Sequence, residues 1–372
     1  MQRLFTYWMK RLAVRPVTAD KQLFLLSEEE QNSLRKLERI TLWISALIGA
    51  VMVLVLYVPQ YALPGWFAEE IYTLPFTGIT FPLSIPSLVY GIVLVYIEIL
   101  MLTALHLYCA HEIAVRTGLF TDAQNKHAGS LSELVRIGME KKDKSLSLYG
   151  LDPFQGLSRW AVFLRNVVFT LKATLSNLLI KLLVRRLFGR YVMRAVLDLL
   201  GIPIFAFWNV WASRRVLREA RVVIMGEHLL QALATQLQGE IHASYHSLVY
   251  DALQFVAISK RDYHSNHSRL AALILNRYGI ERRSKHLLDK DYAERFRKAP
   301  EHVQELCLLI IVLGMIIDGH LSVREKLRLD RLEQRGFINF SADEAKHWCE
   351  DFVKGRGLQN LLTRFPHIVK AA

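Results

Sequence analysis

The sequence predicts an all-α protein that combines an N-terminal transmembrane helical hairpin, a membrane-associated helical hairpin and a C-terminal soluble α-helical domain. Two apolar stretches, residues 40–58 and 85–108, have the length of membrane spans. Basic residues border further apolar runs between residues 161 and 221. From about residue 219 onward, helix formers dominate and no run of alternating strand residues occurs. With 52% hydrophobic residues in 372, the chain has room for membrane segments and a soluble part.

The two stretches are long enough to cross a hydrocarbon core of ~30 Å, because a helix rises ~1.5 Å per residue. Residues 40–58 carry no charge, and residues 85–108 carry only Glu98. A polar lead precedes the first stretch and no small-residue cleavage site follows it, so we expect it to remain as an anchor. The predicted parts are a cytoplasmic N-terminal segment (1–39), two transmembrane helices with a short external loop (40–108), a cytoplasmic connector (109–160), a basic hairpin (161–221) and a soluble domain (222–372).

The distribution of Lys and Arg predicts the orientation. Residues 59–84 contain none, whereas residues 109–159 contain seven and the first 39 residues contain Arg3, Lys10, Arg11, Arg15, Lys21, Arg35, Lys36 and Arg39. Under the positive-inside rule the N-terminus and the downstream part are cytoplasmic, and residues 59–84 lie outside. That external loop contains Pro59, Pro64, Pro75 and Pro82, so we expect it to be stiff and non-helical.

Residues 161–221 pair apolar runs with basic side chains: Lys181, Arg185, Arg186, Arg190, Arg194, Arg214 and Arg215. If both runs crossed the membrane, the basic group at 181–194 would lie outside, against the positive-inside rule. An interfacial or re-entrant hairpin is therefore favoured, with these cations on anionic lipid headgroups. Two further spans and burial in a soluble core are the alternatives. The same clustering makes lipid a better anionic partner than nucleic acid for a chain of net charge +13.

The notable polar residues of the second predicted span are Glu98 and His106. An intramembrane carboxylate indicates either a proton or ion pathway or a helix-locking hydrogen bond, here to Ser45 or Thr41. With two spans, a pore would require a homo-oligomer. The helix-locking role is therefore favoured.

A turn motif follows the apolar run at residues 306–317, which is too short to span a membrane and fits a central buried helix. Gly319 permits the backbone to reverse, and Ser322 with Glu325 forms a predicted capping box for the next helix. Asp318 and Glu325 flank the turn as candidate ligands for a divalent cation. An EF-hand is excluded because its first and third ligand positions would fall on Gly314 and Ile316. A capped helix-turn-helix without metal is the simpler interpretation.

The segment at about 300–365 resembles the TerB-like domain of tellurite-resistance proteins. The matching residues are Asp318, Gly319, Ser322 and Glu325, followed by Leu327, Leu329 and Leu332. The resemblance implies an all-helical domain, acidic turn residues as metal ligands, and a place beside membrane proteins in bacterial envelope-stress systems. Basic neighbours of the acids, Arg324, Lys326 and Arg328, depart from that pattern and disfavour metal binding.

Other potential ligands give little further indication of chemistry. His242 and His246 stand four apart on a predicted helix, a spacing that suits zinc, but no HExxH motif is present. Cys109, Cys307 and Cys349 are widely spaced and are predicted to be buried thiols of a reducing compartment. A nucleophile elbow, a P-loop and a dinucleotide fingerprint are all absent from the sequence.

These observations predict a non-catalytic scaffold in the bacterial inner membrane that presents a TerB-like module to a cytosolic protein partner, in envelope or metal stress response. No cofactor is expected apart from a divalent cation, and no nucleic acid. The alternatives are an oligomeric small transporter or channel that uses Glu98, and a metal-dependent enzyme that uses Asp318, Glu325 or the His242–His246 pair.

Overall fold

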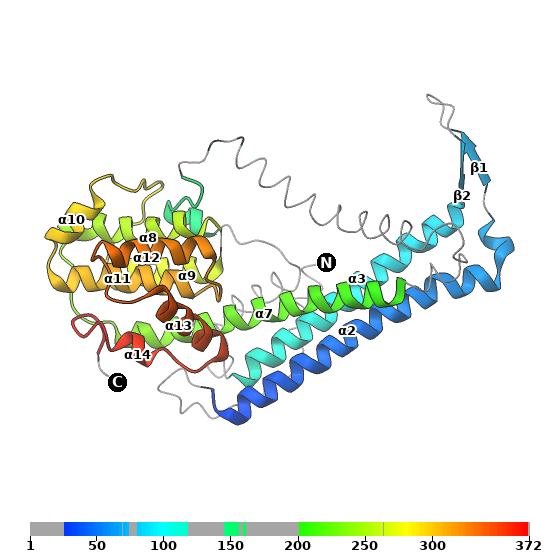
Figure 1. The fold of residues 1–372 in the computed structure, drawn as a ribbon, viewed down its shortest axis with the longest axis horizontal. Helices are drawn as coiled ribbons and strands as arrows, with labels where there is room; N and C mark the ends of the chain where they lie inside the picture. Colours follow the sequence, from blue (N-terminus) through cyan, green and yellow to red (C-terminus); the bar gives the residue numbers. More distant parts are fainter. Residues whose placement is uncertain are drawn as a thin grey trace. The chain divides into compact units, whose positions relative to one another are not determined.

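A computed structural model describes residues 26–68, 70–73, 80–117, 145–155, 158, 160, 201–262 and 264–370 (Figure 1). These residues form two compact units. Among them, the first unit contains residues 35–111 and 201–218, and the second contains 26–34, 112–117, 145–155 and 219–370. Helices account for most of both units, as the sequence predicts.

The first unit is built from α2 (Glu28–Ala62), α3 (Ile85–Arg116) and the first half of α7 (Gly201–Gln236). Helices α2 and α3 are long and apolar enough to cross a membrane. Only 28% and 6% of their most apolar windows are buried among the described residues, so they differ from the core helices of a soluble protein. Large apolar side chains instead point outward, among them Trp43, Leu47 and Ile92.

Between α2 and α3 the chain forms a 3-10 turn, η1 (Pro64–Phe67), and a β-hairpin. Strands β1 (Glu70–Thr73) and β2 (Thr80–Leu83) pair antiparallel, with Glu70 opposite Leu83 and Thr73 opposite Thr80 (Figure 1). The predicted non-helical connection is confirmed for the β-hairpin. It is wrong before the hairpin, because α2 continues through Pro59 to Ala62 and η1 is a 3-10 helix.

The second unit surrounds α11 (Glu301–Ile316), which is preceded by α8 (His246–Lys260), α9 (Ser265–Arg277) and α10 (Tyr292–Lys298). Its other elements are η2 (Ser145–Tyr149), η3 (Ala243–Tyr245), α12 (Val323–Gln334), α13 (Ala342–Lys354) and α14 (Gln359–Leu362).

Helix α11 confirms the prediction of a central buried helix: nearly all of its side chains after Glu305 are buried, and it packs most extensively on α8. That close packing depends on Gly314. A Cβ atom at this position would lie 2.4 Å from Cγ1 of Val256 on α8. The glycine in the middle of the apolar run therefore lets the two helices approach, at the cost of some helix propensity.

The second unit extends beyond the predicted soluble domain at 222–372. Leu146 and Leu151 of the predicted connector are buried in it, and the His286 N–H donates to the Gly150 carbonyl at 2.9 Å. Residues near the start of α2 also belong to it, since the Leu26 N–H donates to the Gly355 carbonyl at 2.8 Å. The predicted boundary at residue 221 lies within α7, which continues as one helix to Gln236.

Several predictions concern residues outside the described part of the chain. These are the cations between residues 1 and 25, most of the connector at 118–144, and the hairpin at 161–200 with Lys181, Arg185, Arg186, Arg190 and Arg194. Arg214 and Arg215 are described, and both are exposed on α7.

Candidate functional site

The turn between α11 and α12 has the conformation that its sequence predicts. Gly319 adopts a left-handed φ of 69°, where a side chain would be strained. Ser322 accepts a hydrogen bond from the Glu325 N–H, and the Glu325 carboxylate accepts one from the Ser322 N–H at 2.8 Å. The predicted capping box is confirmed, and it fixes the Glu325 carboxylate beside the turn.

The two acids of this turn, Asp318 and Glu325, form ion pairs with a buried lysine side chain. Lys260, the last residue of α8, places its Nζ atom 2.8 Å from Oδ1 of Asp318 and 3.1 Å from Oε2 of Glu325. The same ammonium donates to the His320 carbonyl at 2.7 Å. Its side chain is only 1% exposed. All three ammonium hydrogens therefore have acceptors, as a buried lysine requires.

The electrostatics of this cluster favour the ionised acid. Burial by itself raises the pKa of Asp318, but the Lys260 ammonium, with His267 and His264 nearby, outweighs burial and lowers that pKa overall. A metal ion at Asp318 and Glu325 would have to displace Lys260 or share both carboxylates with it. The divalent cation at these residues stays a prediction, and the geometry favours the capped, lysine-bridged turn.

A second buried polar group joins three helices of the same unit. Asn266 on α9 donates from Nδ2 to the Val222 carbonyl on α7 at 2.9 Å and to the Ile317 carbonyl at the end of α11 at 2.8 Å. Close by in sequence, Nε2 of His267 lies 2.9 Å from the Gly314 carbonyl. Burial lowers the pKa of His267 to about 4, so it is neutral at ordinary pH and donates to that carbonyl.

A third cluster surrounds Asp251, a fully buried carboxylate on α8. It accepts from Nε2 of His286 at 2.8 Å, from the Arg295 guanidinium and from the Asp289 N–H. No local sequence signal indicates this cluster, because the partners of Asp251 lie more than 30 residues away and share no motif. Every carboxylate oxygen is hydrogen-bonded, so the cluster ties α8 to the segment around α10.

The two histidines whose spacing suits zinc, His242 and His246, do not share a helical face. His242 precedes η3 and caps it by accepting from the Ser244 N–H, whereas His246 begins α8 and donates to the Ile241 carbonyl at 3.3 Å. The predicted helix would have to include residue 242, but the chain is not helical there. Burial of the three cysteines as free thiols is confirmed.

The polar residues of the predicted second span bind partners on α7. Asn209 donates from Nδ2 to Oε1 of Glu98 at 2.7 Å. Nε2 of His106 lies 2.7 Å from Oγ of Ser213, which in turn lies 2.7 Å from Oγ of Ser45 on α2. His106, Ser213 and Ser45 thus form a buried hydrogen-bonded series across α3, α7 and α2, and the Glu98–Asn209 pair is a separate contact between α3 and α7.

The helix-locking interpretation of Glu98 agrees with these contacts, although its predicted partners were wrong. The Glu98 carboxylate binds Asn209, and Ser45 binds Ser213, because α7 packs against both α3 and α2 within the first unit. Gly49 permits that approach: a Cβ atom there would lie 2.8 Å from Nδ2 of Asn209 and 2.9 Å from the Phe205 carbonyl oxygen. Small residues at such contacts are typical of helix packing in membranes.

Comparison with known proteins adds no relative: no protein family, curated protein or solved structure matches this chain. The TerB-like resemblance accordingly stays a prediction based on Asp318, Gly319, Ser322, Glu325 and the leucines that follow them.

The Lys260 contacts predict a large effect of neutralising this side chain. Lys260→Met should lower the free energy of unfolding of the second unit by about 3–5 kcal/mol, because Asp318 and Glu325 lose the cation that compensates their burial. Urea-dependent exposure of the buried thiols of Cys307 and Cys349 in the detergent-purified chain would measure it. The matched control is Lys298→Met: Lys298 forms a solvent-exposed pair with Glu294 at 2.6 Å, and its loss should change the stability far less than the loss of Lys260. Equal effects of the two variants would contradict the assignment.

The low pKa of His267 predicts a loss of stability in acid. The unfolded chain protonates this histidine near pH 6.5, whereas the folded chain does so only near pH 4. The stabilisation is therefore complete above pH 6.5 and declines as the pH falls toward 4, by up to about 1.4 kcal/mol per pH unit. His267→Gln keeps a donor for the Gly314 carbonyl and removes the titration, so its unfolding profile should be flatter over this interval. Parallel profiles for the two proteins would refute this origin of the acid sensitivity.

Proposed function

We propose that the chain is a non-catalytic protein of the bacterial inner membrane, anchored by α2 and α3, that presents its helical second unit to a cytosolic protein partner. The observation that carries this proposal is the contrast between the two units. The first directs large apolar side chains outward, while the second has its own buried core around α11. The simplest interpretation of this contrast is that the first unit anchors the second to the membrane.

The buried polar clusters of the second unit support a presenting role over catalysis. Lys260, Asn266 and Asp251 all bind groups of the same unit, and each joins separate helices. Such contacts hold a module in one conformation. A TerB-like relationship and a role in envelope or metal stress are the finer form of this proposal, supported only by the motif at Asp318 to Glu325.

The charge distribution supports the proposed orientation. Residues 59–84, which include the β-hairpin, contain no Lys or Arg, while the flanking segments are rich in both. The module would then lie in the cytoplasm. Arg214 and Arg215, exposed on α7, are proposed to bind anionic lipid headgroups at the cytoplasmic surface.

Helix α12 offers a surface for the partner. Val323 and Leu327 are 74% and 52% exposed and stand four residues apart, followed at the same spacing by the exposed Arg331. Residues at this spacing share one helix face. An apolar pair flanked by Arg324 and Arg331 fits a partner segment that is apolar and acidic.

A substitution on this face tests the proposal. Leu327→Glu should reduce crosslinking of the full chain to its cytosolic partner in intact cells at least tenfold, because it places a charge in the apolar contact and opposes an acidic partner. The matched control is Leu287→Glu, since Leu287 is 54% exposed and lies outside α12. A crosslinked product that is equally abundant in wild type and both variants, or absent from all three, would overturn the proposed surface.

The buried polar residues of the first unit favour a second candidate function, that of an oligomeric transporter or channel. Glu98, His106 and Asn209 are buried polar residues in helices whose outward side chains are apolar, and such residues commonly line proton or ion pathways. Glu98 is hydrogen-bonded to Asn209 and His106 to Ser213, and these contacts favour helix locking instead, so transport is the second candidate.

Proton flux in reconstituted vesicles separates the two candidates. If the protein transports protons, Glu98→Gln should abolish flux, because glutamine keeps the contact with Asn209 but cannot carry a proton. Glu112→Gln, at the end of α3 and paired with Arg116, should leave flux unchanged. Flux that persists in Glu98→Gln, or that is absent from the wild-type protein, would eliminate transport through Glu98.

A further inference from the structure

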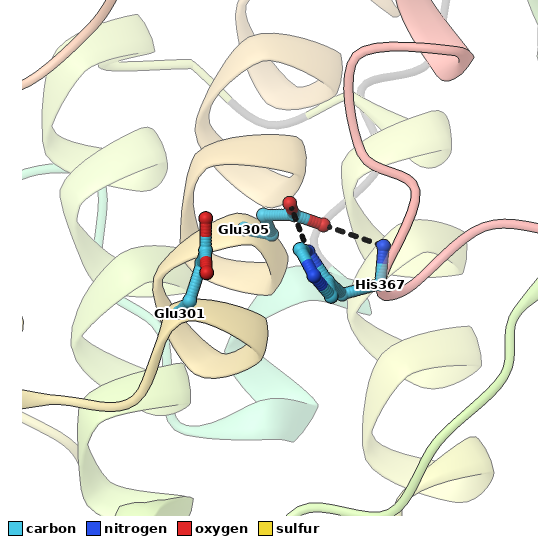
Figure 2. A group of neighbouring side chains, drawn as sticks. All are labelled: Glu301, Glu305 and His367. Carbon is cyan, nitrogen blue, oxygen red and sulfur yellow. Dashed lines mark hydrogen bonds and ion pairs between the residues drawn. The ribbon is translucent and has the colours of Figure 1, made fainter.

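Three potential metal ligands that the sequence analysis did not connect lie together at the start of α11. Glu301 and Glu305 stand four residues apart on this helix, and His367 lies in the C-terminal segment (Figure 2). The sequence signal is weak because more than 60 residues separate the histidine from the two acids. Only folding of the C-terminal segment onto α11 brings the three together.

Two of the three side chains, Glu305 and His367, contact each other directly, and Glu301 lies beside them (Figure 2). Nδ1 of His367 lies 2.6 Å from Oε1 of Glu305, and the His367 N–H donates to Oε2 of the same carboxylate at 3.0 Å. Glu301 faces the same space from the preceding turn (Figure 2). Ligand atoms from all three residues lie within 4.8 Å of one another.

The backbone that carries His367 is held firmly. The Gln238 N–H donates to the Ile368 carbonyl at 2.8 Å, and the Lys370 N–H donates to the Gln236 carbonyl at 2.9 Å, on either side of the bridge between Leu237 and Val369. The imidazole side chain is nevertheless 52% exposed, so an ion can reach it from solvent. Rigid backbones with accessible ligands suit a binding site.

We propose that Glu301, Glu305 and His367 bind one divalent transition-metal ion of the zinc class. One imidazole nitrogen and two carboxylate oxygens supply three protein ligands, and solvent completes a tetrahedral set. The imidazole favours zinc over magnesium and calcium, which prefer oxygen ligands alone. The ion would fasten the C-terminal segment to the start of α11. This inference is independent of the proposed function and of the Lys260-occupied acids Asp318 and Glu325.

The simpler alternative is that His367 and Glu305 form only a hydrogen-bonded ion pair. Glu301 distinguishes the two, because the pair does not need it whereas a three-ligand site does. Glu301→Gln removes one ligand charge and leaves the contacts between His367 and Glu305 in place. It is therefore more informative than a change of either member of the pair.

Titration of the detergent-purified full chain with Zn²⁺ against a chromophoric chelator tests the site. Wild type should bind one zinc ion per chain, and Glu301→Gln and His367→Ala should each weaken binding at least tenfold. His302→Ala is the matched control: His302 is next to Glu301 on α11 but is not part of the cluster, and its loss should leave the affinity unchanged.

Zinc should also raise the midpoint of thermal unfolding of wild type but not of Glu301→Gln. Zinc affinity that is equal in wild type and Glu301→Gln, or zinc binding that His302→Ala weakens as much as His367→Ala, would overturn the proposal and leave the ion pair as the sole role of these residues.

Discussion

The main constraint on the structure is that buried polar side chains on two long apolar helices need hydrogen-bond partners. Helices α2 and α3 expose tryptophan, leucine and isoleucine side chains, and their buried Ser45, Glu98 and His106 bind side chains of α7. A hydrocarbon environment favours this arrangement, since an unpaired polar group there has no water to bind. The glycine at position 49 allows the close approach on which the contact between Asn209 and Glu98 depends.

In the second unit, by contrast, the apolar side chains are buried in the core. Its few buried charges are compensated locally: Lys260 by two acids and a carbonyl, and Asp251 by His286 and Arg295. Buried ion pairs of this kind add little net stability over an apolar core, but breaking them is costly. They consequently specify which helices meet, as the proposed presenting role would require.

Local features of the fold could be predicted from the sequence, and long-range ones could not. The apolar runs in α2, α3 and α11, the reversal at Gly319 and the capping box of Ser322 and Glu325 are each encoded within a few residues. The partner of the acids is different, because Lys260 lies 58 residues from Asp318 and 65 from Glu325. Nothing in a single sequence signals such a pairing.

The same reason explains the boundaries that the sequence analysis placed differently. An apolar segment next to a basic one suggested a hairpin that ends at residue 221. Instead, α7 continues to Gln236 through both apolar and basic residues. Leu146 and Leu151 looked like parts of a connector because their apolar neighbours are distant in sequence. Helix periodicity defines elements, but packing partners decide which unit an element joins.

Side-specific thiol labelling tests whether α2 and α3 cross a bilayer and leave the helical module in the cytoplasm, as proposed. The native cysteines are buried, so a single cysteine introduced at the exposed Glu333 would provide the accessible thiol. A membrane-impermeant maleimide should label it in inside-out vesicles and not in intact spheroplasts, while a cysteine at the exposed Ile71 on β1 should show the reverse. Labelling of position 333 from the exterior of spheroplasts would contradict the account.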